Sequence, residues 1–184
     1  MARKLVLVKP DMGYAEEIGE YRKETLAGGG AFHGASGLYD YDDPAAWVEH
    51  CRLMERRETL PDPDWVTAEQ FMLVYEGERR ALGMINFRHY FNDYLAEYAG
   101  HIGYSVRPSE RRKGYAKAML RLCLDYAGRF GLDKVLITCR DDNEASRRVI
   151  LSCGGVFERT AVKDDGEVME RYWIAVGPSA ATVG

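Results

Sequence analysis

The feature that most constrains the fold is a strand, a basic turn and an amphipathic helix in direct succession. The strand is the short apolar run at residues 100–106, Gly-His-Ile-Gly-Tyr-Ser-Val. It ends before Pro108, because proline cannot donate a hydrogen bond to a β-ladder. The turn is Arg-Arg-Lys at residues 111–113. From Gly114 onward, apolar residues recur three or four positions apart, which is the spacing of one buried helical face.

The start of this helix predicts a binding site for phosphate. The first amides of a helix have no intrahelical partner and carry a partial positive charge, so a phosphate there receives several hydrogen bonds at once. Gly114 has no side chain to block close approach and Ala116 has almost none. Arg111, Arg112 and Lys113 add positive charge. The turn therefore predicts a pyrophosphate site, although it matches neither the P-loop nor the Gly-x-Gly-x-x-Gly pattern.

Three blocks of sequence follow one another from this turn toward the C-terminus. The first is Arg-x-x-Gly-x-Ala at residues 111–116. The second is Val-Leu-Ile-Thr-Cys at 135–139, followed by Asp-Asn-Glu-Ala-Ser at 142–146, and the third is Gly-Gly-Val-Phe at 154–157. In content, order and spacing they resemble the GNAT N-acetyltransferases, whose acetyl-CoA signature is similar to the first block. Without the other blocks, a solvated basic turn would be the preferred interpretation.

The resemblance extends over residues 69–175 and implies a single GNAT acetyltransferase domain at residues 1–176, with a flexible tail at 177–184. The fold class is α/β (α+β), a mixed and mostly antiparallel sheet of about six to seven strands. Helices are expected on both faces, and the central parallel strands are expected to splay apart. The pattern along the chain reads β-α-α-β-β-β-α-β-α-β-β, without repeats or a linker. The runs at 85–89 and 101–104 are similar to a poorly characterised bacterial branch.

The resemblance implies that the chain uses acetyl-CoA as acyl donor, without a metal, and acetylates a primary amine by direct attack in a ternary complex. The main chain of Tyr104, Ser105 and Val106 would hold the pantetheine arm and polarise the thioester carbonyl. The basic turn and the helix start would hold the pyrophosphate, and the loop after the next strand would also bind the arm. These further cofactor residues are Arg111, Arg112, Lys113, Gly114, Tyr115, Ala116, Lys117, Asn143 and Ser146.

A general base is expected, because the attacking amine must be neutral and a lysine-like amine has a pKa of about 10.4. Many family members have a glutamate where this chain has His101. An imidazole is mostly neutral at pH 7 and can accept a proton directly or through water. The alternative is a packed strand histidine bonded to the backbone. Glu97 is the next candidate for the base, ahead of His89 and Glu110.

The general acid departs from the family pattern. Many members have a tyrosine seven residues after the position of Asn143, where this chain has Ile150, which cannot donate a proton. The leaving thiolate would then take a proton from Ser146, a nearby tyrosine or water, or would leave unassisted. The catalytic candidates are therefore His101, Glu97 and Ser146.

The charge balance and cysteine usage limit the partners. A net charge of −4 argues against nucleic acid, whose binders usually carry a basic excess. No signal peptide or membrane span is visible, so we expect a cytoplasmic protein with no membrane partner. None of the four cysteines are spaced as Cys-x-x-Cys, which predicts reduced core thiols. Homodimers are common in the family, so a homodimer is one expectation.

The acceptor cannot be identified from sequence beyond a small-molecule or peptide amine. Two irregular segments rich in tyrosine, at residues 31–43 and 88–99, are expected to line the acceptor site. Transfer of a longer acyl group is the enzymatic alternative. A non-catalytic acyl-CoA-binding sensor or scaffold is the alternative from another class.

Overall fold

The computed structural model describes residues 3–177, which contain seven strands and four α-helices. The strands are β1 (Leu5–Val8), β2 (Ala68–Tyr75), β3 (Gly83–Arg88), β4 (Ile102–Val106), β5 (Lys134–Arg140), β6 (Val156–Val162) and β7 (Val168–Ala175). The helices are α1 (Ala15–Ala27), α2 (Pro44–Leu53), α3 (Tyr115–Phe130) and α4 (Glu144–Ser152). A π-helical turn, Leu95–Ala99, precedes β4. The expected α/β class and element order are confirmed.

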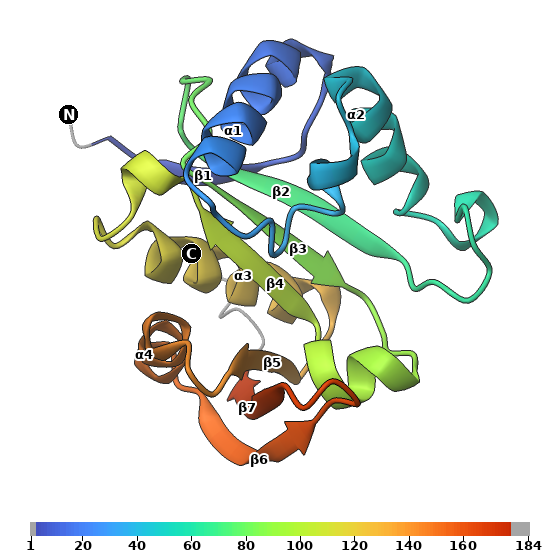
Figure 1. The fold of residues 1–184 in the computed structure, drawn as a ribbon, viewed down its shortest axis with the longest axis vertical. Helices are drawn as coiled ribbons and strands as arrows, with labels where there is room; N and C mark the ends of the chain where they lie inside the picture. The colour runs from blue at the N-terminus through green and yellow to red at the C-terminus, as the bar shows by residue number, and fades with distance from the viewer. Residues whose placement is uncertain (1–2, 178–184) are drawn as a thin grey trace, which may run out of the picture.

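The strands form two antiparallel groups that meet at β4 and β5. One group has the order β1-β2-β3-β4, and the other has the order β5-β7-β6. Between the two groups, the described chain has only an isolated bridge from Gly100 to Ile137, just before β4 begins. Figure 1 shows the four-stranded group crossing the molecule above the three-stranded group. The edge of β4 that faces β5 is therefore free of strand pairing, as the expected splay requires.

Helices cover both faces of the four-stranded group (Figure 1). Successive side chains of a strand point to opposite faces, and β2 is apolar on both. Phe71 and Leu73 pack in the cluster that contains the inner face of α3. Met72 and Val74 pack in the cluster that contains residues of α1 and α2. The sheet is thus a central layer between two cores, which explains the long apolar run of β2.

The loop between α1 and α2 docks directly on β4. Gly34 has φ +68°, and a Cβ there would lie 2.0 Å from the carbonyl oxygen of Gly103. Such an approach of two backbones requires glycine. The buried Gln70 side chain donates to the Gly34 carbonyl oxygen at 2.9 Å and accepts from Ser36 Oγ at 2.7 Å. These contacts fix the loop and place His33 beside β4.

The end of β4 is tied to α1 by a buried cation. The side chain of Arg107 is 4% exposed and ion-pairs with Glu17 and Glu24 of α1. Its Nε lies 2.6 Å from Glu24 Oε2, while Glu24 Oε1 accepts from the Ser109 amide at 2.8 Å. Both acids are therefore needed to compensate a guanidinium removed from water. The network fixes the start of the turn that leads into α3.

The bounds of two elements differ from those expected. Asp11 caps a 3₁₀ turn, Met12–Tyr14, by accepting from the Gly13 amide at 2.7 Å, so α1 begins only after this turn. Helix α2 begins at Pro44 behind its Asp43 cap, as expected, but ends at Leu53 rather than near residue 57. Of the expected tail, residues 178–184 lie outside the described part of the chain.

The four cysteines are free thiols, and three of them are buried. No helix within residues 3–177 combines the length and the apolar character needed to cross a membrane.

Candidate active site

The start of α3 presents a row of unpaired amides. Gly114 is the N-cap residue with φ +84°, and Arg112 also has a positive φ of 61°. The Ala118 amide is the first to bond back, to the Gly114 carbonyl oxygen at 3.2 Å. Among residues 3–177, no acceptor contacts the amides of residues 112–117. A Cβ on Gly114 would meet nothing within 4 Å, so these amides open on free space.

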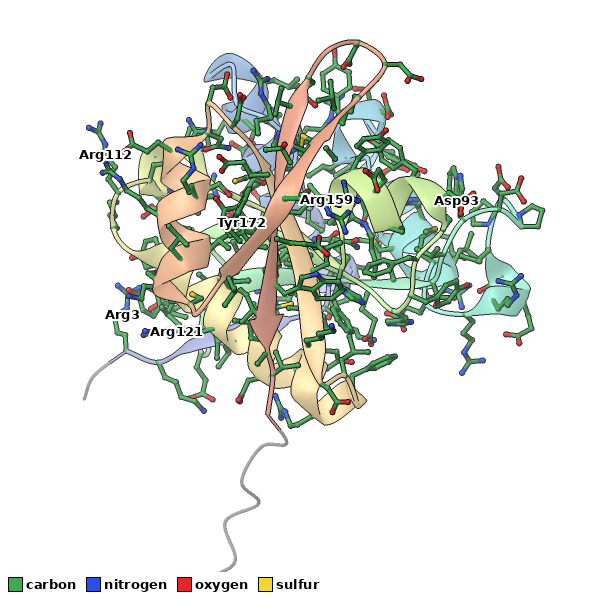
Figure 2. All side chains as sticks on the ribbon, turned by 90° about the horizontal axis from the view of Figure 1, so that it is seen from below. Arg3, Asp93, Arg112, Arg121, Arg159 and Tyr172 are labelled. Atoms are coloured by element: carbon green, nitrogen blue, oxygen red, sulfur yellow. The ribbon has the colours of Figure 1, made fainter. Side chains whose placement is uncertain are left out.

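A cavity of about 520 Å³ lies against these amides. It is lined by every predicted cofactor residue except Lys113 and Tyr115. Arg111, Arg112 and Lys117 contribute positive charge, and none of its lining residues is acidic. Figure 2 shows Arg112 extending outward from the turn that precedes α3. The cavity is therefore a cationic site on a chain of net charge −4, which suits a phosphate ligand.

Lys113 and Tyr115 turn their side chains away from this cavity. Lys113 Nζ lies 2.9 Å from Glu110 Oε2. The hydroxyl of Tyr115 lies 3.0 Å from that of Tyr75. Their main-chain amides nevertheless belong to the unpaired row. Of these two residues, only the main-chain amides could therefore contribute to the predicted phosphate site.

A second cavity, of about 300 Å³, lies between β4 and β5 and adjoins the first. Tyr104 and Ser146 line both cavities. The Tyr104 hydroxyl lies 2.9 Å from Ser146 Oγ, and Ser146 is fixed at the start of α4 because its amide donates to Asn143 Oδ1 at 3.1 Å. Burial raises the pKa of Tyr104 to about 12, so its phenol stays protonated at neutral pH.

A third cavity, of about 490 Å³, lies between the α1–α2 loop, α2 and the segment before the π-helical turn. Its wall mixes polar and apolar side chains and includes the aromatic rings of Phe32, His50, Trp65 and Tyr94. The imidazole of His50 packs edge-on against Trp65, with 6.1 Å between ring centroids. This cavity is lined by residues of both irregular segments that were expected to form the acceptor site. Of the tyrosines in those segments only Tyr94 lines it, and Tyr39, Tyr41, Tyr90 and Tyr98 do not.

His33 borders all three cavities, and it is the only residue of the described chain that does so. Its side chain is exposed. Sequence reasoning missed it, because a single histidine in a glycine-rich loop forms no motif. The available signal was its position next to Gly34 in a segment already expected to line the acceptor site. The docking of Gly34 on Gly103 brings it to β4.

His101, the first candidate for the base, is enclosed by protein. It is 6% exposed and lines none of the three cavities. Its Nδ1 accepts a hydrogen bond from the Leu136 amide at 2.9 Å, and its ring centroid lies 4.1 Å from that of Phe91. Burial, together with the charge of Arg88, lowers the pKa of His101 to about 4. This placement favours the alternative interpretation of a packed histidine bonded to the backbone.

Glu97 and the two weaker candidates also lie outside the three cavities. The oxygens of Glu97 lie 2.8 and 2.6 Å from the guanidinium of Arg159, which lowers the pKa of the carboxyl. His89 Nδ1 lies 2.8 Å from Thr67 Oγ1. Glu110 pairs with Arg80 and Lys113. Ser146 is thus the only one of the predicted catalytic residues at the cavities.

The comparisons with known proteins agree with this fold. The family model described as "Acetyltransferase (GNAT) domain" matches residues 36–156. The ribosomal-protein-S5-alanine acetyltransferase from Vibrio fischeri is 18% identical with a TM-score of 0.71, over 96% of this chain and 95% of that chain. A GNAT-family acetyltransferase from Bacillus anthracis is 22% identical with a TM-score of 0.67, over 95% and 96%.

A third solved structure is a ribosomal L7/L12 alpha-N-protein acetyltransferase in complex with coenzyme A. It is 16% identical with a TM-score of 0.70, over 96% of this chain and 97% of that chain. No curated protein matches the chain by sequence. The structural likenesses, all below 25% identity, extend the shared fold over nearly the whole chain.

Proposed function

Because the chain belongs to the GNAT acetyltransferase family, whose domain model covers residues 36–156, we propose that it acetylates a primary amine by direct attack in a ternary complex. The supporting observation is the series of three adjoining cavities that share His33. One has the unpaired amides that a diphosphate needs, one opens between the splayed strands, and one has room for an acceptor. When bound, acetyl-CoA supplies the acetyl group as a thioester.

The residues at the start of α3 fit the diphosphate of this acyl donor. The free amides of residues 112–117 provide hydrogen bonds, and Arg111, Arg112 and Lys117 neutralise charge. The unpaired edge of β4 fits the rest of the donor. Since the Arg107 amide bonds to Leu82 on the β3 side, the alternate amides of Tyr104 and Val106 point to the open side. Fixed amides of this kind stabilise a developing oxyanion.

We assign the role of general base to His33. It is exposed to all three cavities, so it can reach the incoming amine and the place where the acyl donor ends. An imidazole accepts a proton near neutral pH, either directly or through one water. His101 is a weaker choice, because its Nδ1 lone pair already accepts from Leu136 and its pKa is lowered to about 4.

Tyr104 and Ser146 form the general acid in this proposal. As the carbon–nitrogen bond forms and the carbon–sulfur bond breaks, His33 takes the proton from the amine. Tyr104, hydrogen-bonded to Ser146, gives a proton to the leaving thiolate. Burial raises the pKa of Tyr104, so the phenol is protonated at neutral pH and its hydrogen is present when negative charge develops on the sulfur. The pair thereby replaces the tyrosine that many family members have at the position of Ile150.

The decisive experiment combines calorimetry with coenzyme A and release of free thiol from acetyl-CoA over a panel of amines, with the product identified by mass spectrometry. The proposal expects coenzyme A binding and an N-acetylated product. Binding without turnover on any amine would favour a sensor or scaffold. Faster turnover of a longer acyl-CoA would favour a different acyl group. We expect the reaction in the cytoplasm.

A further inference from the structure

The side chain of Arg88, at the end of β3, has no anionic partner among residues 3–177. It lines the cavity between β4 and β5 and also the third cavity, of about 490 Å³, which we call the acceptor cavity. Its Nη1 donates to the carbonyl oxygens of Ala99 at 3.3 Å and Gly100 at 3.1 Å. Its Nη2 lies 3.4 Å from the position of a Cβ on Gly103, beside the docked loop. Burial lowers the pKa of Arg88 to about 10, so the guanidinium remains charged at neutral pH.

The other sheltered arginines of the described chain are all paired with a carboxylate. Arg107 pairs with Glu24 at 2.6 Å, Arg147 with Glu170 at 2.7 Å, and Arg171 with Glu158 at 2.7 Å. Arg22 pairs with Asp42 at 2.7 Å. A charge removed from bulk water destabilises the fold unless an opposite charge compensates it. Arg88 is the exception, and it lines two of the three cavities.

The charges around Arg88 favour an anion. None of the residues that line the acceptor cavity is acidic. The cavity between β4 and β5 contains one acid, Glu167, and that carboxylate is engaged by Lys163 and by Arg140, whose Nε lies 3.4 Å away. The two cavities together are therefore cationic, within a protein of net charge −4. Such a site repels polycationic amines and attracts amines that also carry a negative group.

The remaining wall of the acceptor cavity favours a ring or another apolar body. Phe32 and Tyr94 come from the two irregular segments, and Trp65 comes from the connection before β2. Trp65 is 43% exposed and Tyr94 is 53% exposed, so part of each side chain is accessible to a ligand. The volume of about 490 Å³ lies within the usual range for small-molecule sites. Aromatic side chains around a space of this size suit a stacked or edge-on ring.

We propose that the acceptor is a small amine that carries a carboxylate, as an aromatic α-amino acid does. The guanidinium of Arg88 binds the carboxylate, and Phe32, Trp65 and Tyr94 enclose the apolar side chain. Arg88 and His33 line the same two cavities. A carboxylate bound to Arg88 would therefore place the neighbouring α-amine of the acceptor in the cavities that His33, the proposed base, also lines. This inference rests on the proposed acetyl transfer and names the substrate class for it.

The test uses three related probes on the protein saturated with coenzyme A: phenylalanine, phenylalanine amide and phenethylamine. They share the ring and the amine, but only phenylalanine has a carboxylate. Calorimetry should show phenylalanine binding at least about tenfold more tightly than the other two, because a charge-assisted hydrogen bond is about twice as strong as a neutral one. Arg88→Met should remove this preference while leaving the affinity for phenethylamine within about twofold.

Arg121→Met is the matched control, because Arg121 is exposed on α3 and lines none of the three cavities (Figure 2). Arg121→Met should bind phenylalanine more tightly than the other two probes by the same factor as wild type. Arg88→Lys retains the charge without the planar fork and should show an intermediate preference. If Arg88→Met does not fold, the affinities of the three probes for wild type and for Arg88→Lys still test whether Arg88 binds the carboxylate.

Equal affinity of phenylalanine and its amide would overturn the inference and favour the amino terminus of a peptide. Failure of all three probes to bind would overturn it as well. Binding of phenylalanine through Arg88 without release of thiol from acetyl-CoA would support the assigned ligand class while refuting the proposed transfer. Failure of the assigned ligand class and failure of the proposed acetyl transfer therefore give different results.

Discussion

The phenol oxygen of Tyr104 lies 2.9 Å from Oγ of Ser146, where the cavity at the start of α3 meets the cavity between β4 and β5. Tyr104 comes from β4, and Ser146 lies in the first turn of α4, which Asn143 caps. The contact crosses the opening between the two groups of strands. It supplies a protonated hydroxyl in a chain that has Ile150 at the family's usual tyrosine position.

The first prediction concerns this hydroxyl. Tyr104→Phe should lower kcat for thiol release by about 10- to 100-fold. This is at or below the lower limit of the usual contribution of an acid–base group, because a thiolate is a good leaving group. KM for acetyl-CoA should change little, since the ring remains. Tyr98→Phe is the control: Tyr98 lines the same cavity, but its hydroxyl donates to the Val162 carbonyl oxygen at 3.4 Å. Equal effects of the two substitutions would exclude Tyr104 as the acid.

The second prediction concerns the start of α3. Gly114→Glu should reduce the affinity for coenzyme A by more than about 100-fold, because a carboxylate would occupy the space in front of the free amides and repel the phosphates. Calorimetry measures the loss directly. Gly77→Glu controls for backbone strain, because Gly77 has φ +81° against +84° for Gly114 and also has nothing within 4 Å of its added Cβ.

Gly77 lies in the turn between β2 and β3, so its substitution should cost similar stability and leave binding intact. Comparable loss of coenzyme A affinity in both variants would mean that strain, and not the position, causes the effect. It would also remove the assigned phosphate site.

The free amides that we propose as the cofactor site could be predicted from sequence, because their determinants are local. The strand end, the glycine and the helix start lie within one short segment, so the geometry of the amides follows from secondary structure alone. Asn143 could be placed in the same way, because its capping bond to Ser146 spans three residues. The fold could also be predicted, since β2 is apolar on both faces and so requires helices on both sides.

The surroundings of the candidate bases could not be predicted in the same way, because contacts between distant segments determine them. His101 becomes enclosed through its bond to Leu136, which is 35 positions away. His33 reaches β4 because Gln70, 36 positions from Gly34, holds the loop. Arg88 differs from the other sheltered arginines only in lacking a carboxylate partner, and those partners come from residues distant in the sequence. No periodicity or spacing in the sequence encodes these relations.

The third prediction separates the two histidines. His33→Gln should lower kcat by about 100-fold at pH 7 and by less at higher pH, where more of the amine is already neutral. Its stability should stay within about 0.5 kcal/mol of wild type, because the side chain is exposed. A rate profile that keeps both its height and its shape would rule out His33 as the base.

His101→Ala should instead act mainly on stability. It removes the acceptor of the buried Leu136 amide and leaves a gap beside Phe91. An unsatisfied buried donor costs about 1–3 kcal/mol, and the lost packing adds to this. Urea unfolding measures the change. A large fall in kcat of the folded variant, without a loss of stability, would restore His101 as a catalytic candidate.

The fourth prediction concerns acid stability and the network around Arg107. Partial burial alone would raise the pKa of Glu24, but hydrogen bonds from Ser109 and Arg107 lower it to about 2. In the unfolded chain, a glutamate has a pKa of about 4.3. A carboxyl whose pKa is lower in the folded state stabilises the fold above the unfolded value, and the contribution is lost as the pH falls toward 2.

Glu24→Gln should therefore reduce the free energy of unfolding at pH 7 by about 1–3 kcal/mol, because Arg107 keeps only Glu17 as a charged partner. The loss should shrink between pH 4.5 and pH 2, where wild type also loses its charge at this position. Glu49→Gln is the control, since its pair with Arg52 is exposed and such pairs contribute little to stability. Urea unfolding at pH 7, 4 and 3 measures both variants. A Glu24→Gln loss that stays constant over this range would show that Glu24 acts through its hydrogen-bonding shape rather than its charge, and the turn before α3 would not depend on an ion pair.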